Sequence, residues 1–230
     1  MPRSLFIGIL FVVCILAAAA GCTGQPASRV IVTPTVTITV PNGDTAEKTF
    51  NALSRAPLND TERADIVRLQ EDQKYITDIN TILARQHPDI PVFQNIANAS
   101  IVYQDADNVI LQRYGITTPE KDAQGAFSSQ KLQSTVDNDV NTGSNSVRDA
   151  LLVSARGEDM HIADLEAAIG RTDNPDIQFM DRQELVSSRN NLRTISQWIT
   201  AYKGVYTPSF IPVDYYKSLT SSPVEQVLQK

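Results

Sequence analysis

Four segments of this chain repeat apolar residues at intervals of three and four positions, the spacing that places them on one side of an α-helix. The segments run over residues 60–86, 91–115, 146–169 and 175–203. The first opens with the capping sequence NDTERAD, and the second ends at Gly115, a residue suited to a left-handed helix end. The pattern predicts an all-α chain whose four amphipathic helices bury their apolar stripes against one another.

The lengths of the links predict how these helices connect. The first and second helices are joined by a short link, as are the third and fourth, so each pair should form an antiparallel hairpin. The link over residues 115–145 is long enough to cross the bundle and to hold a short helix over residues 129–139. One long crossover between the second and third helices is the ferritin-like pattern, and a ferritin-like four-helix bundle is therefore the predicted fold.

The first residues have the composition of an export signal. Arg3 precedes an apolar run over residues 5–20, and small residues lead to Cys22 in the sequence AAAAGC. This end resembles a lipobox, in which the cysteine is lipidated and becomes the new N-terminus. We expect a signal peptide over residues 1–21, a lipid on Cys22, and a protein held by that lipid at the outer face of the cytoplasmic membrane. An uncleaved signal that serves as the membrane anchor is the alternative.

The mature chain is expected to consist of a tether and one domain. Residues 22–57 are rich in Thr, Pro and Val and show no helical period, which predicts an extended tether. An edge strand over residues 30–40 is the alternative there, although Pro34 interrupts it. The folded domain should occupy residues 58–219, including an aromatic tail, and residues 220–230 form the C-terminal end.

Charge and residue types narrow the classes of function. The formal net charge is −6 at pH 7 and no basic cluster occurs, so nucleic acid is not an expected partner. Cys14 would leave with the signal, and Cys22 alone cannot form a disulfide or a cysteine metal site within one chain. With only two histidines and no glycine-rich phosphate loop, the sequence gives no basis for triad or phosphate-loop chemistry.

Each predicted helix carries polar residues at mid-length on the side that should be buried. Buried polar groups are costly unless they bond to one another or to an ion, so a polar cluster is predicted in the middle of the bundle. His161 joins this cluster if the third helix turns it inward in place of Ile162; otherwise it lies at the surface beside Asp159 or Asp164. The assigned positions are Gln73, Ser100, Tyr103, Asp107, Glu158, Glu184, Ser188 and Asn191.

The segments PVFQNIANAS, LQRYGI, SVRDALLVSARGEDMHIADLEAAIGRTDNPDI, SSRNNLRTI and YTPSFIPVDYYKSL span most of the predicted domain. Together they resemble a ferritin-like domain family of unknown function found in exported bacterial and archaeal proteins. The block IADLEAAIGRTDNPDI is the most specific part of the resemblance. It implies a metal site with a Glu in the first helix, a Glu-x-x-His pair in the second, a Glu in the third and a His in the fourth.

Most of the ligand positions that the resemblance implies carry neutral residues in this chain. Gln73 stands where the first Glu is implied, and Ser100 and Tyr103 stand for the Glu-x-x-His pair. Asn191 replaces the His of the fourth helix, and Glu158 is kept. The resemblance therefore implies a ferritin-like fold with a degenerate two-metal site and no favoured cofactor.

Three functions remain open on this basis. The expected function is a non-catalytic binding or structural role at the cell surface, with a hydrogen-bonded remnant of a metal site. The first alternative is a ferritin-like oxidoreductase or metal-storage protein that binds iron or manganese through Glu158, His161, Asp107 and Glu184. The second is a peptide or small-molecule binding module that uses the aromatic tail, in which such rings more often cover a core: Tyr202, Tyr206, Phe210, Tyr215 and Tyr216. Beyond the membrane, the sequence identifies no partner.

Overall fold

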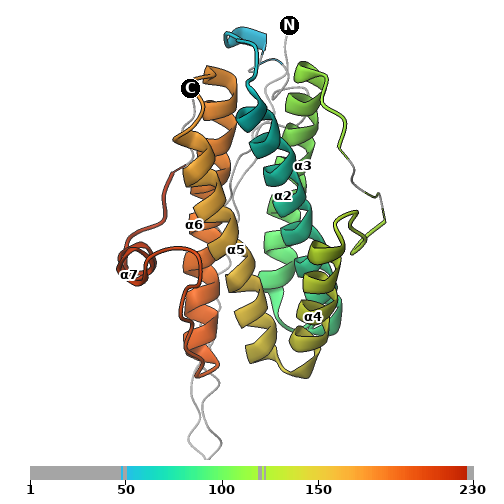
Figure 1. Cartoon of the computed structure of the whole chain (residues 1–230). Coiled ribbons are helices and arrows are strands. Elements are labelled where there is room, and N and C mark those ends of the chain that lie inside the picture. Colours follow the sequence, from blue (N-terminus) through green and yellow to red (C-terminus); the bar gives the residue numbers. More distant parts are fainter. Residues whose placement is uncertain (1–47, 49–50, 119–120, 122, 227–230) are drawn as a thin grey trace, which may run out of the picture. The chain divides into compact units, whose positions relative to one another are not determined.

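The computed structural model of the protein describes residues 48, 51–118, 121 and 123–226 (Figure 1). In these residues the regular structure is helical, which confirms the prediction of an all-α chain. The predicted signal, Cys22 and most of the predicted tether lie outside them. The helices are α2 (Asp60–Gln86), α3 (Pro91–Tyr114), α4 (Gln130–Asn145), α5 (Val147–Ile169), α6 (Pro175–Ala201) and α7 (Val213–Ser221).

Local sequence sets the ends of the long helices. At the start of α2, the Asn59 side chain accepts a hydrogen bond from the Glu62 backbone N–H at 3.0 Å, and the Glu62 carboxylate accepts one from the Asn59 N–H at 2.9 Å. α3 ends at Gly115, whose φ of 62° is left-handed, as predicted. The Ser146 hydroxyl caps α5. The fourth long helix ends at Ala201, slightly before the predicted end.

The four long helices pack as two hairpins. α2 packs on α3, and α5 packs on α6, as the short links predict. The hairpins meet where α2 packs on α5 and α3 packs on α6 (Figure 1). α3 and α5 are not neighbours, so the link between them crosses from one hairpin to the other.

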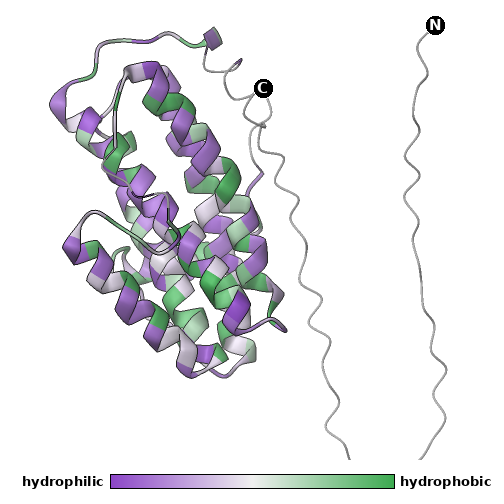
Figure 2. Cartoon of the chain, turned by 90° about the vertical axis from the view of Figure 1, so that its right-hand side faces the viewer, coloured by the Kyte–Doolittle hydropathy of each residue, from purple (hydrophilic) through white to green (hydrophobic). Residues whose placement is uncertain are grey.

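The apolar stripes of the long helices meet in the interior. In Figure 2, each long helix in view carries both hydrophilic and hydrophobic residues, as expected for amphipathic helices. The stripe residues are the apolar residues that recur at three- and four-residue spacing in the four predicted helices. Most of them are buried, whereas Val147, Ile169 and Trp198 are partly exposed. The buried stripe residues are Ile66, Leu69, Ile76, Leu83, Phe93, Ile96, Ile110, Leu151, Leu165, Ile177, Leu185, Leu192 and Ile195.

The helix within the crossover link is longer than predicted. α4 continues to Asn145, whereas the sequence predicted a helix over residues 129–139. Its later part is polar, but Gly143 is buried against Leu83, where a Cβ atom on the glycine would lie 2.4 Å from a Leu83 methyl carbon. The carbonyl oxygen of Gly143 also lies 2.7 Å from Nε2 of His87. This close approach to the end of α2 supports a helical turn that the sequence pattern did not indicate.

A buried ion pair fixes the start of the link on α2. The Lys74 ammonium pairs with the Asp78 carboxylate and donates to the Ala123 carbonyl oxygen at 3.3 Å. Asp78 also accepts a hydrogen bond from the Gly125 N–H at 2.9 Å. The ammonium lies 4.8 Å from the centre of the Phe127 ring. The link is therefore held by charged groups that water hardly reaches, since the two side chains are 5% and 10% exposed.

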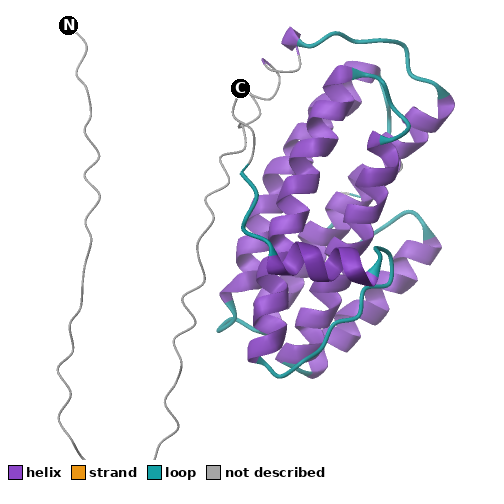
Figure 3. Cartoon of the chain, turned by 90° about the vertical axis from the view of Figure 1, so that its left-hand side faces the viewer, coloured by secondary structure: helices purple, strands orange, loops and turns teal. Residues whose placement is uncertain are grey.

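The start of the C-terminal tail is held by one buried carboxylate of α5. Asp159 is 0% exposed and accepts hydrogen bonds from the Tyr206 hydroxyl at 2.7 Å and from the Ser209 N–H at 2.6 Å. It also accepts from the N–H groups of Phe210 at 3.2 Å and Ile211 at 2.9 Å. α7 follows this attachment and lies across the long helices (Figure 3). The start of the tail is thus held on α5 by one side chain, and its later part is held on α6, where Arg189 donates to the Tyr215 hydroxyl and Arg193 to the Leu219 carbonyl oxygen.

The aromatic residues of the tail divide between core and surface. Tyr206, Tyr215 and Tyr216 pack against the hydrophobic core, whereas Tyr202 and Phe210 are 40% and 43% exposed. Most of these rings therefore cover the core.

Within the described residues, none of the helices combines the length and the apolar character that a membrane span requires.

We expect Asp159→Asn to destabilise the fold by ~2–4 kcal/mol, because an amide has one acceptor oxygen and no charge for the donors that the carboxylate now serves. Urea denaturation followed by circular dichroism measures this free energy of unfolding. The matched control is Asp214→Asn, since the Asp214 side chain on α7 is 98% exposed and should change stability by less than about 0.5 kcal/mol. Equal effects of the two substitutions would contradict the role of Asp159.

Candidate functional site

The polar residues predicted for the bundle centre do lie in its interior, but they form two groups about one helical turn apart. In the hydrogen-bonded group, neutral side chains bond to one carboxyl and to main-chain carbonyl oxygens. In the acid–histidine group, carboxyls surround one imidazole. The hydrogen-bonded group consists of Gln73, Ser100, Tyr103, Glu158, Ser188 and Asn191. The acid–histidine group consists of Asp72, Asp107, His161, Asp164, Asp181 and Glu184.

Glu158 is the carboxyl of the hydrogen-bonded group and is 0% exposed. The Asn191 amide donates to its Oε1 atom at 2.9 Å. Burial raises the pKa of Glu158 to about 8, against the opposing effect of hydrogen bonds from Ser188 and Asn191. At pH 7 the carboxyl is therefore mostly protonated, and the group needs no cation to balance it.

The other members of the hydrogen-bonded group bond to the main chain of neighbouring helices. The Gln73 amide of α2 donates to the Ser100 carbonyl oxygen of α3 at 2.9 Å. The Tyr103 hydroxyl of α3 donates to the Gln183 carbonyl oxygen of α6 at 3.3 Å. Burial raises the pKa of Tyr103, which keeps the phenol protonated. These contacts join three helices through neutral groups.

His161 lies in the interior, so its surface placement beside Asp159 or Asp164 is wrong. Both His161 and Ile162 are 0% exposed, because α5 packs against α2, α4 and α6. Nε2 of His161 lies 3.4 Å from Oε2 of Glu184. Burial lowers the pKa of His161 to about 3, so this contact joins a neutral imidazole and a carboxyl at pH 7. Neither ring nitrogen has a hydrogen-bond partner.

The carboxyls around His161 raise one another's pKa values. Glu184 is 1% exposed, and burial raises its pKa well above the usual range. The charges of Asp181 and Asp72 raise the pKa further, whereas Asp107 lowers it. Asp181 is 5% exposed, and burial together with Asp107 raises its pKa as well. In the ionised form these side chains would place several negative charges in a space that water hardly reaches.

Arg68 and Arg182 border the acid–histidine group, and Arg182 acts on Asp181. Arg68 pairs with Asp164, and its side chain is 34% exposed. Burial raises the pKa of Asp72, as do the charge of Asp164 and a hydrogen bond with it, whereas Arg68 lowers it. The guanidinium of Arg68 therefore favours the ionised form of Asp72 and also opposes protonation of His161.

The sequence analysis did not place Asp72 or Asp181 in the interior. A signal for both was present, because Asp72 falls between Leu69 and Ile76 at helical spacing. Asp181 falls in the same way between Ile177 and Leu185. Extending each apolar stripe through every intervening position would have found them.

The interior does not fit the two-metal site that the family resemblance implies. Gln73, Ser100, Tyr103 and Asn191 are amide, hydroxyl and protonated phenol groups, which are weak ligands for such ions. Among the residues that the structure describes, no three His, Cys, Asp or Glu side chains surround a common point as the ligands of one ion would. A two-metal centre is therefore not preformed in the described part of the chain.

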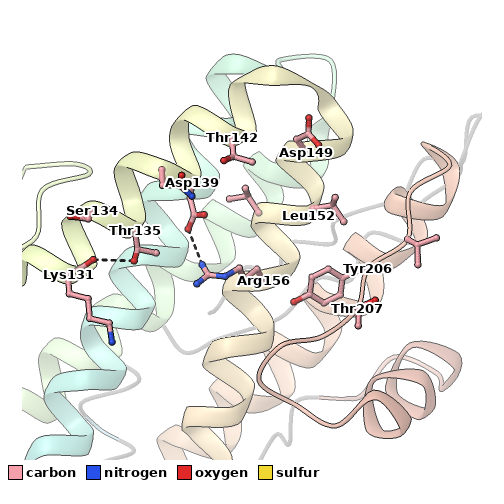
Figure 4. A pocket seen from close by; sticks show the side chains of 13 residues that line it. Lys131, Ser134, Thr135, Asp139, Thr142, Asp149, Leu152, Arg156, Tyr206 and Thr207 are labelled. Atoms are coloured by element: carbon pink, nitrogen blue, oxygen red, sulfur yellow. Dashed lines mark hydrogen bonds and ion pairs between the residues drawn. The ribbon is translucent and has the colours of Figure 1, made fainter.

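A surface groove of about 960 Å³ lies between α4, α5 and the start of the tail (Figure 4). Within it, Arg156 donates to Asp139 at 3.1 Å, and Asp139 also accepts a hydrogen bond from the Tyr75 hydroxyl at 2.7 Å. Leu152 and Val205 supply part of its apolar lining. No member of the two interior groups lines this groove.

Residues 62–223 match the family described as uncharacterized protein domain DUF2202. The chain is 32% identical over 182 residues to uncharacterized protein MJ0754 of Methanocaldococcus jannaschii, which covers 79% of this chain and 98% of that protein. The crystal structure of hypothetical protein MJ0754 from Methanococcus jannaschii is similar with a TM-score of 0.72 at 33% identity, covering 75% of this chain and 99% of that chain. Both interior groups fall within the matched residues, and the chain belongs to the DUF2202 family.

Proposed function

We propose that this protein is a lipid-anchored, extracytoplasmic bundle of ferritin-like topology that acts as a non-catalytic binding or structural protein. The proposal has three parts: the topology, the loss of a two-metal redox centre, and the location. A different observation supports each part.

The ferritin-like topology is supported by the way the two hairpins are joined. α3 and α5 are not neighbours, and the link between them contains α4 and is anchored on α2 by Lys74 and Asp78. A bundle of two antiparallel hairpins with one long crossover is the ferritin-like arrangement.

The surroundings of Glu158 carry the functional part of the proposal. A two-metal centre brings about four positive charges, which carboxylates and imidazoles must balance. Glu158 instead faces the neutral groups of Ser188 and Asn191. Its raised pKa of about 8 fits a protonated, hydrogen-bonded carboxyl. An oxidoreductase that uses Glu158, His161, Asp107 and Glu184 together is less well supported, because Glu158 belongs to a different group from the other three.

The location rests on the N-terminal sequence, which lies outside the described residues. The apolar run and the AAAAGC end have the form of a lipoprotein signal.

A test of the location follows from Cys22. The wild-type protein should incorporate a fatty-acid label and fractionate with membranes, because the lipid inserts its chains into the bilayer. Cys22→Ala should lose the label, whereas Cys14→Ala, a change within the signal, should keep it. A Cys22→Ala protein that is still fully membrane-bound after signal cleavage would count against lipid anchoring.

The state of Glu158 predicts a pH dependence of stability. A carboxyl whose pKa is raised in the folded protein keeps its proton while the unfolded chain releases it, so folding stability falls as pH rises from about 5 to 8. Glu158→Gln removes the group that titrates. Between pH 5 and 8, the free energy of unfolding should therefore fall by ~1–3 kcal/mol less in the variant than in the wild type. Urea denaturation at a series of pH values measures the difference.

Asp105→Asn serves as the control for this series, because it removes an exposed carboxyl of α3 and should leave the pH dependence unchanged. At pH 7, Glu158→Gln should be as stable as the wild type or slightly more stable. Stoichiometric iron or manganese in the purified protein, lost together with stability in Glu158→Gln, would overturn the proposed function in favour of a metal-dependent enzyme.

A further inference from the structure

We propose that the acid–histidine group binds a single divalent transition-metal ion, with His161, Glu184 and Asp107 as its ligands. None of these residues stands at a metal position that the family resemblance implies. The site goes beyond the proposed function, because it concerns a different group of side chains and does not depend on the lipid anchor.

The imidazole of His161 is the first observation that points to an ion. It is 0% exposed, and neither of its nitrogens has a hydrogen-bond partner. Its Nε2 atom lies 3.4 Å from a carboxyl oxygen of Glu184, which is itself 1% exposed. A buried polar group without a partner needs a physical explanation, and an ion bound between the two side chains provides one.

The accumulation of carboxyls is the second observation. Glu184 is buried, Asp107 lies close enough to lower its pKa, and Asp181 and Asp72 lie close enough to raise it. Buried carboxyls at such distances must either hold protons or share a cation. The guanidinium of Arg68 is paired with Asp164 and also acts on His161, and Arg182 acts on Asp181. The carboxyls of the group still outnumber these two guanidiniums.

The donor types indicate which ion the site would take. One imidazole with carboxylates suits Mn²⁺, Fe²⁺ or Zn²⁺, whereas Ca²⁺ and Mg²⁺ prefer oxygen ligands alone. The carboxylates of Glu184 and Asp107 would balance the two positive charges. Asp72 and Asp181 would then be hydrogen-bonding neighbours that orient the ligands.

Binding requires the side chains to turn toward one another. The three proposed ligands do not surround a common point in this structure, so the carboxyls of Glu184 and Asp107 must rotate toward the His161 ring. The ion would replace the protons that these carboxyls hold, and proton release should accompany binding.

A small cavity borders one member of the acid–histidine group, Asp181. It has a volume of about 10 Å³, enough for roughly one water molecule, and both Asp181 and Asp65 line it. The Asp65 side chain is 13% exposed and pairs with Arg68 and Arg171.

The test is a Mn²⁺ titration of the full-length protein, purified in detergent and stripped with a chelator. The electron paramagnetic resonance signal of free Mn²⁺ reports binding, and a weakly buffered solution reports proton release. We expect one ion per chain, proton release, and a higher melting temperature with Mn²⁺ present.

Variants place the ion within the bundle. Glu184→Gln and His161→Gln should each weaken Mn²⁺ binding at least tenfold. Glu158→Gln is the matched control, because it makes the same change at a fully buried carboxyl of the other group and should leave the affinity unchanged. Circular dichroism verifies that each variant is folded, and Asp107→Asn replaces any variant that is not.

Each contrary outcome has a distinct meaning. A lack of Mn²⁺ binding would overturn this inference, show that the carboxyls hold protons only, and leave the proposed function standing. Binding that is unaffected by Glu184→Gln and His161→Gln would overturn it too, by placing the ion elsewhere. Loss of binding in Glu158→Gln alone would overturn both this site and the proposed loss of metal from the hydrogen-bonded group.

Discussion

Polar side chains in the middle of the bundle must find their partners inside it, and this constraint organises the structure. All four long helices supply such side chains, and burial makes an unpaired polar group costly. The chain meets the constraint in two ways within about one helical turn. Around Glu158, the neutral side chains of Asn191 and Ser188 bond to a carboxyl whose raised pKa keeps it protonated, although its Oε2 atom has no hydrogen-bond partner. Around His161, carboxyls are in excess over the available donors, which is the condition under which proteins hold protons or bind cations.

Tyr103 belongs to the hydrogen-bonded group and is also affected by the acid–histidine group. Its hydroxyl bonds to the main chain of α6 at Gln183, and the charge of Glu184 contributes to its raised pKa. The neutral phenol thus bonds within the hydrogen-bonded group while the charge of Glu184, in the acid–histidine group, acts on it. This arrangement differs from a two-metal centre, in which carboxylates and imidazoles from all four helices converge on one pair of ions.

The sequence predicts those features that depend on local pattern and capping. The ends of α2 and α3 follow from the NDTERAD cap and Gly115, and the burial of the stripe residues follows from their spacing. The full length of α4 could not be predicted, because it depends on the contact of Gly143 with Leu83, far away in the sequence. The choice between His161 and Ile162 could not be made either. Three neighbouring helices surround α5 and bury both residues, which periodicity on one stripe does not reveal.

Glu158 and Asp159 are consecutive on α5 but serve different parts of the molecule. Glu158 bonds within the interior, while Asp159 holds the C-terminal tail through its bonds to Tyr206, Ser209, Phe210 and Ile211. One turn of helix therefore connects the tail at the surface to the polar interior. By thermodynamic linkage, if detaching the tail from this turn alters the affinity of the interior for a bound ion, then binding of the ion alters the attachment of the tail by the same free energy.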